Sequence, residues 1–186
     1  SSFTLELPPY RRPQITKTII SSLLDRAVFV LLRAVSVAAP AGLIIWLMAN
    51  ITISGENLLT TVSNFLEPFG NFLGLDGVII LAFILGFPAN EIVVPIIIMT
   101  YMSTNTLIEL NDLTQLKALF LDNGWTVVTA INTIIFSLCH WPCSTTLLTI
   151  RKETKSNKWT FIALITPTII GILLCAIINL ISKIFI

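Results

Sequence analysis

Three stretches of this chain carry no Asp, Glu, Lys or Arg over lengths greater than most buried helices reach: residues 34–55, 123–150 and 159–182. A fourth, residues 77–107, is interrupted only by Glu91. About 20 helical residues cross the ~30 Å hydrocarbon core of a bilayer. Charged residues make up 11% of the chain, against about 25% in soluble domains. The sequence therefore predicts an all-α polytopic membrane protein that has the lipid bilayer as its main partner.

Charge and motif content exclude several function classes. The formal net charge is +1, and no basic patch alternates with aromatic residues, so nucleic acid is not an expected partner. The chain has no G-x-x-x-x-G-K-[ST] phosphate-binding loop, and we do not expect it to be a nucleotide-hydrolysing enzyme. The three cysteines lie inside hydrophobic stretches, which is not typical of a secreted disulfide framework.

The pattern divides the chain into two parts. Residues 1–27 predict an extended segment, because residues 3–13 hold three prolines, followed by an amphipathic helix lying on the membrane. Residues 28–186 predict a transmembrane module with four hydrophobic segments: 28–51, 78–102, 126–150 and 159–182. Asp112, followed three residues later by Gln115, resembles a helix-capping box, and Gly124 is a plausible helix stop.

Basic residues set the expected orientation. The N-terminal segment is basic, and so is the loop at residues 151–158, which places both on the cytoplasmic side by the positive-inside rule. Three hydrophobic segments lie between them, and three full crossings would separate the two basic regions. We therefore predict that segment 78–102 is a re-entrant hairpin from the outer side and that segment 126–150 is a broken helix that crosses. The reverse assignment satisfies the charges equally well.

Prolines break both segments. Pro88 and Pro142 lack an N–H, and their rings clash with a carbonyl oxygen four residues earlier in a continuous helix. Pro95 would do the same to the carbonyl of Glu91. If each proline starts a new half-helix, Glu91 and Thr145 occupy equivalent positions three residues later. Paired, proline-interrupted hydrophobic segments indicate a midplane transport site.

Glu91 is the most informative residue of the first break. A carboxylate near the bilayer centre costs about 2.5–3.5 kcal/mol when it is unpaired. One interpretation is a cation ligand or proton carrier. The other is a carboxylate that only stabilises the N-terminus of the second half-helix.

The second break contains Cys139, His140 and Cys143. Thiolate and imidazole suit Fe²⁺, Zn²⁺ or Cu⁺ better than Na⁺ or Mg²⁺, and the two cysteines would share a face of an unbroken helix. The alternative is that the cysteines pack and His140 is a hydrogen-bonded bend residue. Four polar residues are candidates for supporting oxygen ligands or for hydrogen bonds between helices: Asn90, Asn132, Ser144 and Thr145.

Three motifs together resemble one family. They are LELPPYRRP at residues 5–13, GFPANEIVVP at 86–95 and WPCSTTLLTIRKET at 141–154. In this order they resemble the C-terminal permease region of the ferrous-iron transporter FeoB family, and the likeness runs over nearly the whole chain. Glu91 matches the motif glutamate, and Cys143 matches the cysteine proposed to face the ion path. Many relatives have a basic residue where this chain has Asn90.

The resemblance implies the second of two gate modules, a fold shared with concentrative nucleoside transporters. It also implies uptake of Fe²⁺, as transported substrate and not as a permanently bound cofactor, across a bacterial inner membrane. The implied partners are a first gate module and a cytosolic GTP-binding domain, through which alone GTP would act; a homo-oligomer is also compatible with the sequence. Two alternatives are a nucleoside or organic-solute carrier with the same fold and a membrane interaction module that conducts nothing.

Overall fold

The computed structural model describes residues 20, 27–53, 55–104, 106–107, 110 and 112–185. The chain forms two compact units, residues 1–35 and residues 36–186. The extended segment and interfacial helix predicted for residues 1–27 lie almost wholly outside the described residues. Residue 20 and residues 27–35, which include the start of a helix, belong to the first unit. All other described residues belong to the second unit.

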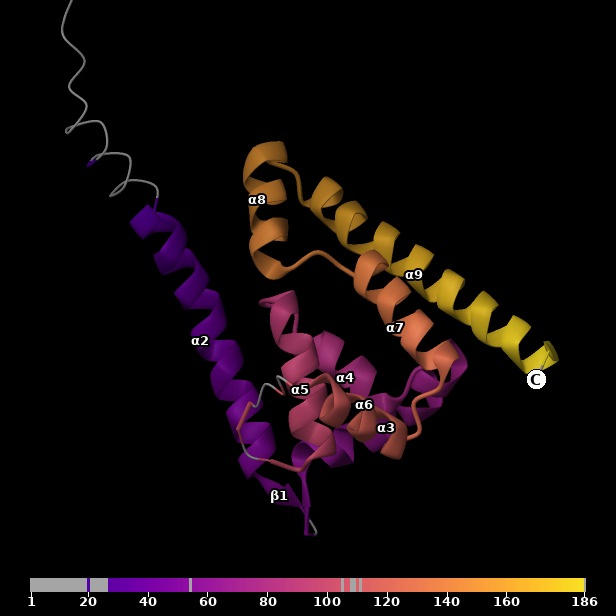
Figure 1. Ribbon diagram of the computed structural model, residues 1–186. Coiled ribbons are helices and arrows are strands. Elements are labelled where there is room, and N and C mark those ends of the chain that lie inside the picture. Colours follow the sequence, from indigo (N-terminus) through magenta and orange to yellow (C-terminus); the bar gives the residue numbers. More distant parts are fainter. Residues whose placement is uncertain are drawn as a thin grey trace, which may run out of the picture. The chain divides into compact units, whose positions relative to one another are not determined.

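The described residues are helical apart from one short strand pair and the connecting turns (Figure 1). The strands β1 (Thr52–Ile53) and β2 (Glu56–Asn57) pair antiparallel. The helices in chain order are α2 (Phe29–Asn50), α3 (Leu58–Leu73), α4 (Gly77–Leu85), the 3-10 helix η2 (Asn90–Ile92), α5 (Val93–Tyr101), α6 (Leu113–Asp122), α7 (Val127–Cys139), α8 (Ser144–Thr154) and α9 (Asn157–Phe185). The prediction of an all-α membrane fold is confirmed.

Three helical stretches within the described residues are long and apolar enough to cross a membrane: Val30–Asn50, Val127–Thr154 and Asn157–Ile184. The second of these contains α7, the turn at residues 140–143 and α8. A further apolar pair, α3 and α4, bends by 106° at residues 74–76. The bend occurs at Gly74, which ends α3 with a φ of +68°, a conformation that favours glycine.

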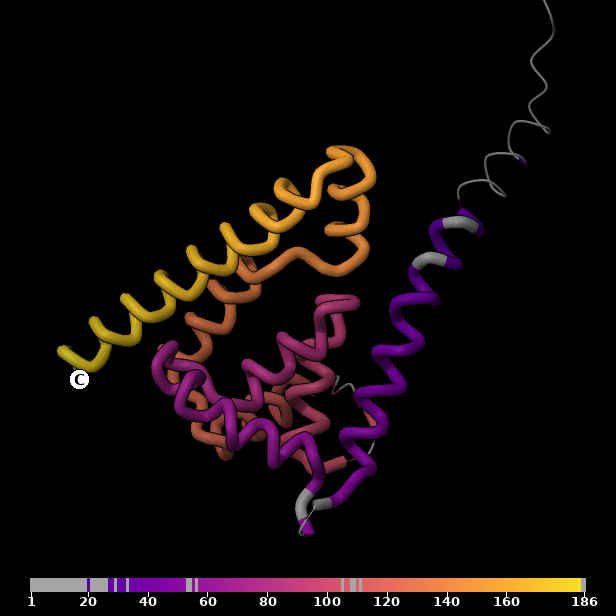
Figure 2. Tube along the Cα trace, turned by 180° about the vertical axis from the view of Figure 1, so that it is seen from behind, coloured from indigo at the N-terminus to yellow at the C-terminus, as the bar shows by residue number. Residues whose placement is uncertain are grey.

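Helices α4 and α5 fold back on each other, as Figure 2 shows from behind. Asp76 is the residue before α4, and Tyr101 is the last residue of α5. The Tyr101 hydroxyl donates a hydrogen bond to the Asp76 carboxylate. The two ends of this segment therefore lie side by side, and its middle, residues 86–92, forms the tip.

The predicted helix boundaries in the connections are confirmed at α6. The Asp112 side chain accepts a hydrogen bond from the backbone N–H of Thr114, 2.9 Å away. Gly124, with a φ of +82°, follows the end of the helix. The basic region 151–158 is not the loop that we expected. Arg151 and Lys152 form the last turn of α8, where cations favour the negative end of the helix dipole, and α9 begins again at Asn157.

Two close approaches hold the core together. At the first, Gly77 of α4 lies against α3, where a Cβ would overlap the carbonyl oxygen of Ser63. At the second, α7 and α9 are joined by Asn132, which is fully buried and donates from Nδ2 to the carbonyl oxygens of Leu73 (2.8 Å) and Cys175 (3.4 Å). Between them lie the buried apolar side chains of α4 and α5.

We expect Gly77→Ala to destabilise the fold by about 1–3 kcal/mol, the usual cost of adding a methyl group to a tightly packed contact. Gly42→Ala is the matched control, since a Cβ there meets no atom within 4 Å. Thermal unfolding of the two purified variants in detergent measures the difference. Equal stability of the variants would show that α3 and α4 do not approach as described.

Candidate functional site

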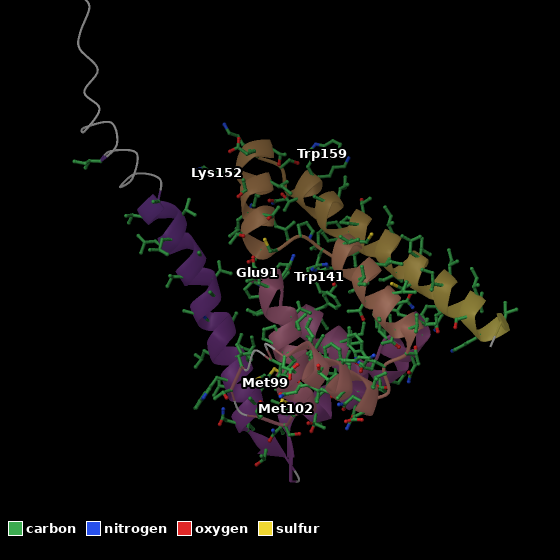
Figure 3. All side chains as sticks on the ribbon, in the orientation of Figure 1. Glu91, Met99, Met102, Trp141, Lys152 and Trp159 are labelled. Atoms are coloured by element: carbon green, nitrogen blue, oxygen red, sulfur yellow. The ribbon has the colours of Figure 1, made fainter. Side chains whose placement is uncertain are left out.

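The two proline breaks lie against each other. The first occupies residues 86–92, at the tip of the α4–α5 hairpin, and the second occupies residues 140–143, between α7 and α8. The backbone N–H of Ser144 donates to the carbonyl oxygen of Phe87, at 3.0 Å. This bond joins two segments that are 57 positions apart in the chain. It places the residues around Glu91 next to the start of α8, as Figure 3 shows for Glu91 and Trp141.

The prolines act alike at the two breaks. α8 begins two residues after Pro142, and η2, which leads directly into α5, begins two residues after Pro88. Glu91 is the second residue of η2, and Thr145 is the second residue of α8. The two residues therefore occupy equivalent positions, as the proline pattern predicts. Pro95 lies in the first turn of α5, where a missing N–H removes no intrahelical bond, so it does not break the helix.

Glu91 has an exposed side chain at the tip of the hairpin. It makes no hydrogen bond and no ion pair with another described residue, and neither η2 nor α5 has a side-chain cap. Helix α4 has nine residues, which corresponds to about 14 Å from its start to the break. Glu91 is thus about half a bilayer away from the end where Asp76 and Tyr101 lie.

Cys143 is the residue that precedes α8. Its Sγ lies 3.2 Å from Oγ1 of Thr145 and 3.1 Å from Oγ1 of Thr146. The sulfur therefore sits at the N-terminal end of α8, where the helix dipole favours negative charge. Thr145, a predicted supporting residue, belongs to this group.

His140 is 8% exposed and lies among aromatic rings. Its ring centroid is 5.0 Å from that of Phe83 and 5.9 Å from that of Trp141. Nδ1 lies 2.8 Å from the carbonyl oxygen of Ser137. That nitrogen must carry the proton to donate to a carbonyl, which leaves Nε2 as the ring atom that can accept or bind an ion.

The two cysteines of the second break do not form a pair on one helix face, because the helix ends between them. Cys139 is the last residue of α7. It packs against Gly171 of α9, where an added Cβ would lie 3.1 Å from the Cβ of Cys139. Cys175 is fully buried against α7, with Sγ 3.4 Å from the carbonyl oxygen of Asn132. Both therefore contribute to the α7–α9 contact.

The remaining predicted supporting residues are spread out. Asn90 is exposed beside Glu91 in η2. Asn132 lies eight residues before His140 on α7, about 12 Å along the helix, and joins α7 to α9. Ser144 is at the contact of the two breaks.

Two polar atoms near the second break are buried without a hydrogen-bond partner among the described residues: Oγ of Ser144 and Nε1 of Trp141. Such atoms are rare in folded proteins, because each costs about 1–3 kcal/mol. Within the described residues, no three His, Cys, Asp or Glu side chains come together in a metal-binding group. The described part of the second break therefore holds individual side chains that could each bind a metal ion, but not a complete set of metal ligands.

The sequence did not reveal a polar cluster at the opposite end of the hairpin. Besides the Asp76–Tyr101 bond, Nε1 of Trp125 donates to the Tyr101 hydroxyl oxygen at 2.7 Å, and the Trp125 ring stacks on Phe120. The available signal was the position of the two aromatic residues. Tyr101 lies at the end of segment 78–102 and Trp125 directly precedes segment 126–150, and amphipathic aromatic side chains are enriched at such segment ends in membrane proteins.

Comparison with known proteins places this arrangement in a family. The family described as "Gate: Nucleoside recognition" matches residues 31–157. The chain belongs to the Gate family. Two relatives are named "Fe(2+) transporter FeoB": one from Staphylococcus aureus is 30% identical and one from Synechocystis sp. is 26% identical. These matches cover 99% and 90% of this chain.

The chain spans about a quarter of the length of these relatives, 27% and 26%. The match over almost the whole chain confirms the resemblance seen in the three motifs: this is a FeoB-like Gate region. No solved structure matches the chain significantly.

The burial of the cysteines gives a test of the packing around the site. We expect N-ethylmaleimide to modify Cys175 at least about ten times more slowly than Cys143 in the folded protein, because only local opening exposes a fully buried thiol. After denaturation the two should react alike. Mass spectrometry of the digested protein assigns the sites, and Cys143→Ser controls the assignment. Rapid modification of Cys175 before denaturation would contradict the α7–α9 contact.

Proposed function

We propose that this Gate region belongs to a transporter of ferrous iron and contributes half of the site through which Fe²⁺ crosses the membrane midplane. The observation that carries the proposal is the hydrogen bond from Ser144 to Phe87, because it holds Glu91 and Cys143 at the meeting point of the two breaks. The two relatives named as Fe(2+) transporters support the choice of ion.

The donor chemistry fits this ion. Fe²⁺ accepts both oxygen and sulfur ligands, whereas Na⁺ and Mg²⁺ prefer oxygen alone. Cys143 supplies a sulfur at the positive end of α8, and Glu91 supplies a carboxylate with no partner among the described residues. His140 Nε2 and the Thr145 hydroxyl lie on the same break.

The exposure of Glu91 indicates how the site is completed. A carboxylate that faces lipid at this depth is costly, so a second protein surface or a water-filled cavity covers it. We propose that this cover is another gate module of the same transporter, which supplies the missing ligands. Since the relatives are about four times as long as this chain, they have room for that module and for a GTP-binding domain.

We further propose that the transporter lies in a bacterial inner membrane, with residues 151–158 on the cytoplasmic side. Segment 78–102 then enters and leaves from the outer side, because its two ends meet at Asp76 and Tyr101. Segment 126–150 crosses as the broken helix, an interpretation supported by the apolar length of Val127–Thr154.

Uptake of radiolabelled Fe²⁺ by the intact transporter tests the site. We expect Glu91→Gln and Cys143→Ser each to lower the initial rate at least about tenfold, since each removes a ligand that is held in place for the ion. Glu153→Gln is the matched control, because Glu153 is an exposed glutamate in the last turns of α8. The amount of each variant in the membrane is measured in parallel. Normal uptake by both site variants would remove the assignment.

The orientation has its own test. Gln115→Cys in α6 and Glu153→Cys in α8 both introduce exposed thiols. In whole cells expressing the intact transporter, a membrane-impermeant maleimide should label the cysteine at 115 but not the one at 153. Permeabilised cells should show both. Labelling of neither position in whole cells, with both labelled after permeabilisation, would instead favour the reversed assignment, with segment 126–150 as the hairpin.

A further inference from the structure

A second polar region lies at the end of the module away from the breaks. It is a cavity of about 450 Å³, which we call the polar cavity. Lys183, near the end of α9, lines it, whereas residues 151–158 lie at the start of the same helix. Because α9 has 29 residues, these two ends are about 43 Å apart. The polar cavity therefore opens on the face opposite the basic region.

Most of the polar side chains that line it carry oxygen. Glu67 and Asp76 contribute carboxylates, and Asn179 and Thr129 contribute an amide and a hydroxyl. No cysteine or histidine of the described residues lines it. Oxygen ligands of this kind suit a hard divalent cation, which prefers oxygen and retains bound water molecules.

Asn179 supplies an acceptor that the fold itself leaves unused. The residue is 9% exposed, and its Nδ2 donates to the carbonyl oxygens of Asn71 and Phe72, each at 2.9 Å. Those two bonds fix the amide orientation. Oδ1 then accepts no hydrogen bond from any described residue, and it faces Gly74, where a Cβ would come within 2.9 Å of it. Both residues line the cavity, so this oxygen of a largely buried side chain is available to a ligand or to its water.

The two carboxylates are already held by protein donors. Glu67 Oε2 accepts from the backbone N–H of Gly77 at 2.7 Å. Asp76 Oδ1 accepts from the backbone N–H of Ile79 at 2.6 Å, and its other oxygen accepts from Tyr101. Each oxygen keeps a further lone pair. Since no third acidic, His or Cys side chain joins them within the described part of the chain, an ion here is best held through its water shell.

The charges favour a cation. Two carboxylates face one ammonium group, that of Lys183, whose side chain is exposed. The N-termini of α4 and α7 each add about half a positive charge, and the C-termini of α3, α6 and α9 each add about half a negative one. The helix ends therefore leave a small negative balance, which adds to that of the carboxylates. The volume has room for about 15 waters at ~30 Å³ each, enough for a fully hydrated ion.

We propose that the polar cavity is an outer antechamber that binds a hydrated divalent cation before the ion loses its water at the breaks. This inference rests on the proposed function. Helices α4 and α7 both begin at the cavity, at Gly77 and Val127, and both end at a break. They define a path of about 14–20 Å from oxygen ligands to the sulfur of Cys143.

The binding test uses the purified intact transporter with Mn²⁺ as a spectroscopic probe. Electron paramagnetic resonance distinguishes free from bound Mn²⁺ and shows whether the ion keeps its water. We expect Mn²⁺ to bind with its water shell intact. Glu67→Gln should weaken this binding about three- to fivefold, the effect of one charge near a divalent ion in salt. Glu153→Gln, the matched change at an exposed glutamate outside both sites, should leave this binding unchanged.

Lys183→Ala is a second variant that should fold normally, because Lys183 makes no hydrogen bond or ion pair within the described residues. Removing its charge should strengthen Mn²⁺ binding and lower the KM for Fe²⁺ uptake by a similar factor, with Lys183→Arg unchanged. Glu67→Gln should raise the KM and leave kcat nearly unchanged. Both effects should shrink as the salt concentration rises.

The outcomes separate the two proposals. If neither charge variant changes Mn²⁺ binding or the KM, the antechamber is wrong, even where Glu91 and Cys143 variants lose uptake. If those site variants transport normally while the charge variants shift Mn²⁺ binding as expected, the antechamber stands and the midplane site is wrong. Mn²⁺ that binds with its water shell replaced would also overturn the antechamber.

Discussion

Backbone groups that leave a helix inside a membrane must find partners within the protein, and the rest of this structure depends on how that requirement is met. The N–H of Ser144 and the carbonyl of Phe87 satisfy each other. Each would otherwise be unpaired at the point where its segment breaks. One hydrogen bond thus joins the two irregular segments, and it places the stretch that carries Glu91 next to the stretch that carries Cys143.

Both ends of the module combine bonded and unbonded polar groups. Around Asp76, Tyr101 and Trp125, donors and acceptors bond to each other, but Oδ1 of Asn132 and Oδ1 of Asn179 nearby accept no hydrogen bond from a described residue. Around the breaks, Ser144 Oγ and Trp141 Nε1 have no partner among the described residues, and the Glu91 carboxylate is exposed. At each end, these groups are where a further partner, protein or ion, has the most to contribute.

The sequence predicted the fold class and both breaks because hydrophobic length and proline chemistry act locally. Pro142 ended α7 close to where its ring requires it. The starts of η2 and α8, each two residues after a proline, agree with the expected match between Glu91 and Thr145. The sequence could not show that Cys139 faces Gly171 while Cys143 precedes α8. Those outcomes depend on contacts between distant segments, which periodicity does not specify.

The fastening of the α4–α5 hairpin has a mechanical consequence. Its base is closed by the Asp76–Tyr101 hydrogen bond and is held to other parts of the chain by the side chains of Trp125 and Glu67, whereas its tip is tied to α8 by one backbone bond. A tilt of the hairpin about its base therefore moves the tip most. Such a tilt changes the separation of Glu91 from Cys143 more than any distance around Asp76, and it breaks only the hydrogen bond between Ser144 and Phe87.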